Sequence, residues 1–180
     1  MENNNDDYSS FLIMLQRNIA FLSIDISVLR NQSGPGSVAK CREFCAKIDL
    51  NKFFTALKNN YAQYLNEQTD LLCDYCRQVK LEYGSARKVL NIFFRHICYS
   101  GFMQEKFLKD QKLYSITSVL APLELPIDSR IAKSLSKEKW ISIKNLDKIN
   151  HKKYQELALA KAQERGIARI HLDIKFWTPA

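Results

Sequence analysis

Hydrophobic residues recur at intervals of three and four along most of the chain, which is the spacing of one face of an α-helix. In the first half this pattern predicts helices over 8–29, 38–46, 50–65 and 69–79. A loop rich in glycine, serine and proline at 31–37 separates the first two. Asp49 is of the residue type that caps a helix N-terminus, and it directly precedes the third.

The second half begins with the most apolar segment of the chain. From Ser85 or Arg87 to about 107, apolar residues cover much of a helix circumference, so we expect this to be the central buried helix. Short helices are predicted over 128–135, headed by Asp128, and over 154–165, where Gly166 ends the pattern. The tail at 167–177 alternates apolar and polar residues, which fits a short C-terminal strand or a helical turn. Residues 113–123 are less periodic, and we expect them to connect the central helix to the helix headed by Asp128.

These elements predict a mostly α protein: one domain over 1–180, folded as a compact helical bundle of two lobes. Charge suggests where the lobes divide. Residues 1–76 hold 7 Lys+Arg and 9 Asp+Glu, whereas residues 77–180 hold 20 and 10. We therefore expect a helical lobe over about 8–76 and a basic lobe over about 77–180. The basic surplus indicates a polyanionic partner, most commonly nucleic acid, although a solvated lysine-rich surface has the same composition.

Two short motifs in the basic half carry candidate chemistry. The first, at 83–91, places Gly84 before Ser85, Ala86, Arg87 and Lys88, and predicts a glycine-bearing turn that opens a helix. Free backbone amides at such a helix start suit a phosphate. The second, at 125–131, reads Leu-Pro-Ile-Asp-Ser-Arg-Ile, so its aspartate follows a rigid approach and heads another helix.

Together these motifs resemble the helix-hairpin-helix DNA glycosylases. In that family a Gly-x-Gly-x-Lys hairpin opens a helix, and a later Val/Ile-Pro-Val-Asp-x-Arg-Val segment carries a catalytic aspartate. Here Lys88 matches the family's nucleophilic lysine and Asp128 its carboxylate, while Ala86 replaces the second glycine. The spacing between Lys88 and Asp128 is similar to that of the archaeal oxoguanine-type glycosylases. The resemblance spans roughly 71–135 and implies a helix-hairpin-helix motif.

The chemistry implied by the resemblance is base excision. Asp128 would stabilise the positive charge that develops on the sugar. A deprotonated Lys88 would attack C1′ and form a Schiff base, which would make the protein a glycosylase with AP lyase activity. The alternatives are that Asp128 only caps a helix and that Lys88 only contacts a phosphate.

A glycosylase must also flip the base from the duplex and enclose it. Residues that are candidates for the base pocket, each also a candidate for the core, are Phe94, Tyr99, Phe102, Trp140 and Trp177. Candidates for contact with the DNA backbone are the turn Gly84, Ser85 and Ala86 and the cations Arg87, Arg95, Arg130, Lys133 and Lys137.

The five cysteines raise the question of a metal. Cys41 and Cys45, with Cys73 and Cys76, would supply four thiolates for zinc, but they lie in apolar helical sequence without glycine-rich knuckles. We expect reduced core thiols, no metal, no iron-sulfur cluster and no cofactor. An odd cysteine count, a polar start and no apolar run of membrane-spanning length predict a cytoplasmic protein with no membrane partner.

The leading prediction is a monomeric DNA glycosylase acting on double-stranded DNA that carries a modified base. Both an oxidised purine and a hypermodified phage cytosine fit, with roles in DNA repair or in antiviral defence respectively. The second class is a helix-hairpin-helix DNA-binding protein without catalysis. The third is a protein-interaction factor whose basic face meets an acidic partner.

Overall fold

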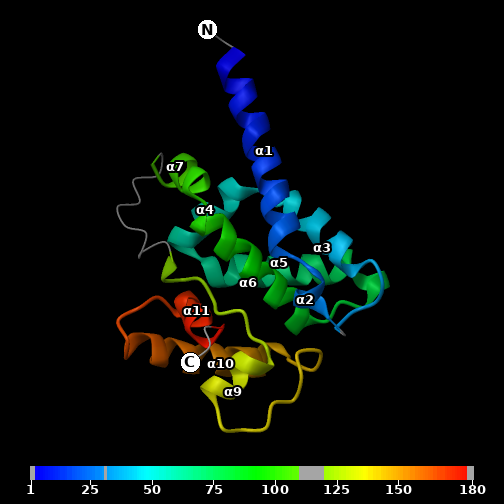
Figure 1. Cartoon of the computed structure of the whole chain (residues 1–180), viewed down its shortest axis with the longest axis vertical. Coiled ribbons are helices and arrows are strands. Elements are labelled where there is room, and N and C mark those ends of the chain that lie inside the picture. Colours follow the sequence, from blue (N-terminus) through cyan, green and yellow to red (C-terminus); the bar gives the residue numbers. More distant parts are fainter. Residues whose placement is uncertain (1–2, 31, 110–119, 178–180) are drawn as a thin grey trace.

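The computed structural model describes residues 3–30, 32–109 and 120–177. Every regular element in these ranges is helical (Figure 1), which confirms the mostly α bundle. In chain order the elements are α1 (Asn3–Ser23), α2 (Ile26–Leu29), α3 (Ser37–Ala46), α4 (Leu50–Asn59), α5 (Tyr61–Tyr75), η1 (Arg77–Val79), α6 (Tyr83–Tyr99), α7 (Gly101–Lys109), α9 (Ser129–Leu135), α10 (Lys148–Gln163), η2 (Arg169–His171) and α11 (Leu172–Trp177). Most of the expected connection, 113–119, lies outside the described residues.

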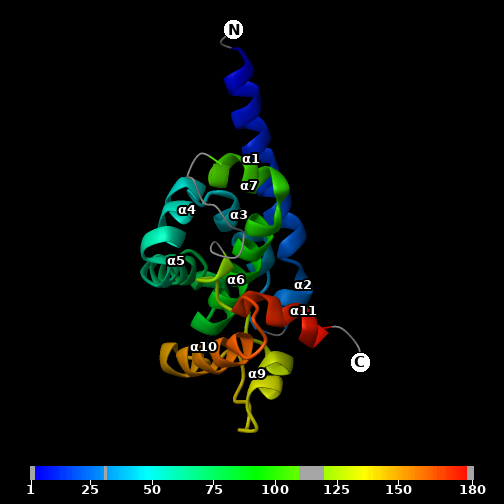
Figure 2. The same cartoon turned by 90° about the vertical axis from the view of Figure 1, so that its left-hand side faces the viewer.

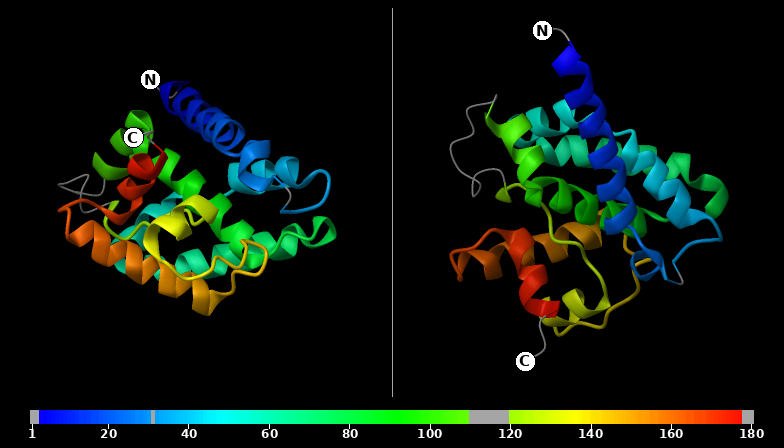
Figure 3. Two further views of the ribbon diagram at one scale, coloured as in Figure 1. Left: turned by 60° about the horizontal axis from the view of Figure 1, so that its bottom comes forward. Right: turned by 45° about the horizontal axis from the view of Figure 1, so that its top comes forward.

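Buried apolar side chains form two clusters. The first contains side chains from Ala20 to Leu123 together with Ile170, and the second contains side chains from Leu125 to Leu172. Figures 1 and 3 show α9, α10 and α11 gathered at one end of the molecule, with α1 to α7 at the other. We call residues 3–123 the N-terminal lobe and residues 125–177 the C-terminal lobe. The clusters thus divide at Glu124, whereas charge suggested a division near 76.

Helix α6 is the centre of the N-terminal lobe and packs against α1, α5 and α7. Its Phe94 ring stacks on Phe53 of α4 with centroids 4.3 Å apart, and all but a few of its side chains are buried. The predicted central buried helix is therefore confirmed. It starts at Tyr83, earlier than the sequence indicated, and ends before Ser100, whose extended backbone (φ −74°, ψ 116°) separates it from α7.

The predicted helix over 8–29 is two helices. Asp25 stops the first and caps α2, with its Oδ1 accepting hydrogen bonds from the amides of Ser27 (2.8 Å) and Val28 (3.2 Å). The break changes which side chains face the core. Leu22 and Ile26, which continue the apolar spacing of this segment, are 76% and 73% exposed. Beyond the core, the N-terminal part of α1 projects past the other helices (Figure 2).

The predicted helix over 50–65 is also interrupted. Asn60 (φ −150°, ψ 60°) ends α4 and precedes α5, which continues through the expected start of the next helix to Tyr75. As predicted, Asp49 caps α4 by accepting hydrogen bonds from the amides of Asn51 (2.9 Å) and Lys52 (3.2 Å).

In the C-terminal lobe the expected helix stop at Gly166 is present, with a left-handed backbone (φ 63°). Helix α10 starts six residues before the predicted 154, because Asp147 caps it by accepting a hydrogen bond from the Asn150 amide (2.7 Å). The strand alternative for the tail is wrong: 169–171 is a 3-10 helix and 172–177 is an α-helix, and the His171 amide donates to the Ala168 carbonyl at 2.9 Å.

Candidate active site

Lys88 and Asp128 lie at one cavity between the two lobes. Lys88 belongs to the second turn of α6, and Asp128 is the N-cap of α9. Both line a cavity of about 670 Å³, which we call the Lys88–Asp128 cavity. Its walls come from the end of α1, from α2, from one face of α6, from the segment before α9, and from α11. The fold thus brings together two residues that are forty positions apart.

The amine of Lys88 is buried, and its pKa is lowered. The side chain is only 8% exposed, and its Nζ donates a hydrogen bond to the Val28 carbonyl at 3.2 Å. Burial lowers the pKa of Lys88, although the carboxylates of Asp128 and Asp25 partly oppose this shift. A buried lysine with a lowered pKa provides more of the deprotonated amine that acts as a nucleophile.

Asp128 is held by its capping bonds. Its Oδ1 accepts hydrogen bonds from the amides of Arg130 and Ile131, each at 3.0 Å, so the predicted N-cap is confirmed. In the described part of the chain no hydrogen bond reaches Oδ2. One oxygen of the carboxylate is therefore fixed to the helix while the other remains available to a bound molecule.

The cavity extends along α6 beyond Lys88. Ile92, Arg95, His96 and Tyr99 follow it on the same helical face. Tyr99 is eleven residues from Lys88, which corresponds to about 16 Å along the helix axis. The far part is polar, because Arg95 forms an ion pair with Asp173 of α11. The sequence-predicted Arg95 thus lines the cavity and is already paired with a carboxylate.

Two aromatic candidates also border the site. The Tyr99 hydroxyl lies 2.8 Å from His171 Nδ1, at the far end of the cavity. Trp140 lines a smaller cavity of about 360 Å³ that also includes Lys88 and Asp128, and its ring meets Tyr154 edge-on at 5.5 Å. An aromatic side chain therefore lies on each side of the amine and carboxylate.

The other aromatic candidates lie elsewhere. Phe94 is fully buried in the first core, stacked on Phe53, so its assignment to a base pocket is wrong. Phe102 is 57% exposed, packs edge-on against Phe11 at 5.5 Å and does not line the cavity. Trp177 is the last residue of α11, and its side chain lies outside the described residues.

The expected glycine turn lies inside a helix. Gly84, Ser85 and Ala86 form the first turn of α6 and are buried. The segment that includes Ile143 and Leu146 covers them, and a Cβ on Gly84 would lie 2.3 Å from the Ile143 carbonyl oxygen. The glycine is needed for this close approach. The prediction that these three residues meet a phosphate is therefore wrong for this conformation, because protein already covers them.

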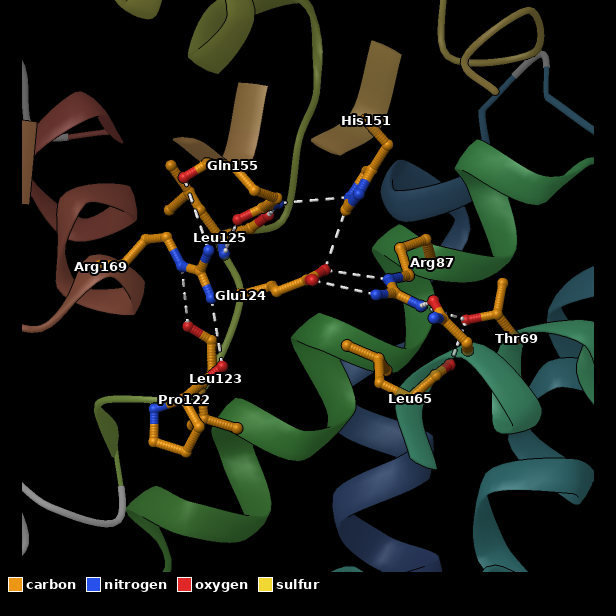
Figure 4. Close-up of polar contacts among 11 residues, drawn as sticks. Leu65, Thr69, Arg87, Pro122, Leu123, Glu124, Leu125, His151, Gln155 and Arg169 are labelled. Atoms are coloured by element: carbon orange, nitrogen blue, oxygen red, sulfur yellow. Dashed lines mark hydrogen bonds and ion pairs between the residues drawn. The ribbon is translucent and has the colours of Figure 1, made fainter. Parts of the chain in front are cut away.

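Arg87 is also buried, 3% exposed, and paired within the protein. Its Nε and Nη2 donate to the two carboxylate oxygens of Glu124, each at 2.9 Å, and its Nη1 donates to Asn66 at 2.8 Å (Figure 4). Burial alone would raise the pKa of Glu124, but the bonds from Arg87 outweigh burial and lower it. Arg87 therefore joins the lobes, and its predicted role as a phosphate contact is not supported.

Around this ion pair lies a polar network that no sequence motif indicates. His151 Nε2 is 3.8 Å from Glu124, and Gln155 both donates to and accepts from the backbone of Leu125 (Figure 4). Burial lowers the pKa of His151 to about 4, so this imidazole is neutral at neutral pH. The network joins three segments that are far apart in the sequence, namely α6, residues 124–125 and α10, and no motif marks it.

Three predicted DNA contacts remain on or next to α9. Arg130, Lys133 and Lys137 are exposed, on the helix that Asp128 caps and just beyond it. Residues missed by the sequence reasoning also line the Lys88–Asp128 cavity, namely Asp25, Arg30, His96 and Asp173. Asp25 was detectable, because an aspartate before Ser27 and Val28 is a capping signal within an otherwise periodic segment.

Among the described residues, no three His, Cys, Asp or Glu side chains are placed to hold a metal ion. Cys41, Cys45 and Cys76 are buried free thiols of the first core, and Cys73 is partly buried.

No helix in the described ranges has the length and apolar character needed to cross a membrane.

The sequence matches no family model, and comparisons with curated proteins and with solved structures give no match either.

Proposed function

We propose that this chain is a DNA glycosylase that excises a modified base from double-stranded DNA and has AP lyase activity. The observation that carries the proposal is the meeting of Lys88 and Asp128 in one cavity, with the amine buried enough to lower its pKa. An amine nucleophile beside a carboxylate is the pair that excision through a Schiff base requires.

In the proposed reaction the neutral Nζ of Lys88 attacks C1′ of the flipped nucleotide. The new C–N bond forms as the bond from C1′ to the base breaks, and the base leaves with the electron pair and takes up a proton. Asp128 stabilises the positive charge on the sugar through its carboxylate. Opening of the sugar ring gives a Schiff base, and loss of a C2′ proton then expels the 3′ phosphate.

The length of the cavity indicates the size of the base that the protein excises. The cavity follows α6 from Lys88 to Tyr99, about 16 Å, which is longer than a single base needs, and its far part is polar. This favours a base with a large polar substituent, such as a hypermodified cytosine, over an oxidised purine. The excised base suggests the role: antiviral defence in the first case, DNA repair in the second.

The non-catalytic DNA-binding alternative has less support. It relied on Gly84 to Ala86 and on Arg87 as the phosphate anchor, and these residues are buried. The exposed cations Arg130, Lys133 and Lys137 on and next to α9 fit a glycosylase and a non-catalytic DNA-binding protein equally well. The interaction-factor alternative predicts little affinity for DNA even at low salt, which a binding titration measures directly.

The test is borohydride trapping on duplexes that carry 8-oxoguanine, 5-hydroxymethylcytosine or glucosylated hydroxymethylcytosine, with unmodified duplex as the background. Wild type should give a covalent protein-DNA adduct and release the modified base, scored by mass. Lys88→Gln should lose both, whereas Lys47→Gln, which alters an exposed cation of the N-terminal lobe outside the cavity, should retain both. An adduct that persists in Lys88→Gln would identify a different nucleophile, and intact duplexes throughout would refute the activity.

A further inference from the structure

A second cavity, of about 750 Å³, lies where α10 meets the turn between α4 and α5 and the start of α6. It shares no lining residue with the Lys88–Asp128 cavity, since Arg87 faces one and Lys88 the other. Its size is within the range of about 300–1,000 Å³ typical of small-molecule sites. The buried network of Figure 4 forms part of its wall.

The charges in this wall are not balanced. Glu124 uses both carboxylate oxygens to accept hydrogen bonds from Arg87. The half-buried Arg169 donates instead to the backbone carbonyls of Pro122 (3.1 Å), Leu123 (3.2 Å) and Gln155 (3.5 Å). Within the described ranges no carboxylate lies within 4.0 Å of Arg169. Two guanidinium groups thus share one carboxylate, and even a half-buried cation is less stable without a counter-ion of its own.

The rim adds more positive charge. Lys58, Lys148 and Lys152 line the cavity, and the carboxylates among the lining residues are those of Glu124 and Glu156. Lys148 pairs with Asp70 at 3.0 Å and Lys152 with Glu156 at 3.9 Å, but these pairs are solvent-exposed and therefore weak. The cavity is positive from its floor to its rim, which favours an anion.

The remaining wall suits a flat organic group. Leu57, Pro122 and Leu159 provide apolar surface, and the Tyr83 ring lies edge-on to His151 at 6.1 Å. Asn66 and Gln155 add amide groups of the kind that read the edge of a base. A buried hydroxyl is also present, because Tyr61 is 5% exposed and its oxygen has no hydrogen-bond partner in the described protein.

We propose that this cavity binds a free nucleoside phosphate. Arg169 and the rim lysines balance the phosphate charge, and the base lies against Tyr83 and the apolar wall. The site is independent of glycosylase activity. Because the walls of the cavity come from both lobes, the ligand stabilises the junction between the lobes. Two of the lining residues are close in sequence to the other cavity: Glu124 is four residues before Asp128, and Arg87 is next to Lys88.

The test is calorimetric titration and thermal melting of the full chain in a phosphate-free buffer at low salt. The probes are the ribo- and deoxyribonucleoside mono- and triphosphates, the corresponding uncharged nucleosides, and inorganic phosphate. At least one nucleoside phosphate should bind and raise the Tm. The nucleosides and inorganic phosphate should bind much more weakly or not at all.

Two substitutions on α10 test whether the ligand binds in this cavity: Lys152→Gln is the test variant and Lys153→Gln is its control. The two lysines are adjacent on α10, but Lys153 pairs with Glu138 at 2.7 Å and does not line the cavity. Lys152→Gln should weaken nucleotide binding roughly threefold to fivefold, the size expected for one exposed charge, whereas Lys153→Gln should leave it unchanged. Both changes are at exposed positions, so the fold is retained.

Three results would overturn the proposal. One is a Tm unaffected by every nucleoside phosphate. Another is an equal response to inorganic phosphate, which would indicate a simple anion site. The third is binding that survives Lys152→Gln but is lost in Lys88→Gln, which would place the ligand in the other cavity. None of these depends on whether any DNA substrate is cleaved.

Discussion

At the scale of single residues, Asp128 has two roles that can be separated. As an N-cap it stabilises α9 through Oδ1, and as a carboxylate it borders the cavity beside Lys88. Asparagine caps a helix about as well as aspartate, because its side-chain oxygen accepts the same amide hydrogen bonds. Asparagine lacks only the negative charge.

Asp128→Asn should therefore abolish base release while changing the free energy of unfolding by well under 1 kcal/mol. Asp128→Ala should lose base release and also about 1 kcal/mol of stability, since the cap is gone. Single-turnover excision assays and chemical denaturation measure the two effects. Full activity in Asp128→Asn would remove the carboxylate from the mechanism.

Arg87 illustrates how strongly environment decides a residue's role. Its sequence context resembled a phosphate-binding turn, yet its guanidinium is buried against Glu124. Removing one member of a buried ion pair leaves the other charge without its partner, which is more costly than removing both.

Arg87→Met should therefore destabilise the protein by roughly 3–5 kcal/mol, and the double change Arg87→Met with Glu124→Leu should cost less than Arg87→Met alone. Urea denaturation of the two variants makes the comparison. Among molecules that remain folded, the salt dependence of DNA binding should equal that of wild type. A shallower salt dependence in Arg87→Met would restore Arg87 as a phosphate contact.

At the scale of elements, the start of α6 depends on how closely the segment at 143–146 approaches it. Gly84 is in a helix, where alanine would ordinarily be favoured by up to about 1 kcal/mol. Here the added methyl group would meet the Ile143 carbonyl at 2.3 Å and the Leu146 side chain at 2.8 Å. The steric cost reverses the usual preference.

Gly84→Ala should destabilise the protein by about 1–3 kcal/mol, the typical cost of overpacking a well-packed site. Gly101→Ala is the matched control, because Gly101 starts α7 and a Cβ there has no other atom within 4 Å. The control should be neutral or slightly stabilising. Equal Tm values for the two variants would mean that the covering segment moves away easily.

Which elements were predictable follows from what local sequence can encode. The apolar face of α6 and the caps Asp49 and Asp128 are local signals, and they were correctly predicted. The breaks at Asp25 and Asn60 were missed, because the apolar spacing continues through both while the chain turns. The tail alternates apolar and polar residues like a strand, yet it is helical, with Ile170 in the first core and Leu172 in the second.

In the candidate site, only the residues that belong to a sequence motif could be predicted. Lys88 and Asp128 were found through the resemblance, and the fold brings them to one cavity. Asp173, Glu124 and Arg169 belong to no motif, because their partners come from other helices and are set by tertiary packing. The burial of Gly84 depends on the segment at 143–146, and the burial of Arg87 on its contacts with Glu124 and Asn66, so neither follows from the local sequence.

At the scale of the whole molecule, the junction between the lobes depends on pH. His151 is buried there with its pKa lowered from 6.5 to about 4, so the unfolded chain takes up a proton more readily than the folded one. The stabilisation due to the neutral imidazole is complete above pH 6.5 and declines as the pH falls from 6.5 towards 4.

The free energy of unfolding should therefore fall between pH 7 and pH 4, by an amount on the order of 3 kcal/mol from His151. His151→Gln should reduce this slope, and urea denaturation at several pH values measures it. Some slope should remain, because burial also lowers the pKa of His96. A wild-type protein equally stable at pH 4.5 and 7 would contradict a neutral buried His151.

The division of the cores at Glu124 has a consequence for synthesis at the ribosome, where chains fold from the N-terminus onward. Nearly all of the first core precedes Leu125, so the N-terminal lobe can collapse while the remaining residues are still being added. Lys88 emerges early and Asp128 forty residues later, followed by the Asp173 partner of Arg95. A nascent chain therefore carries the amine before the carboxylate, and the Lys88–Asp128 cavity is complete only after α11 has been added.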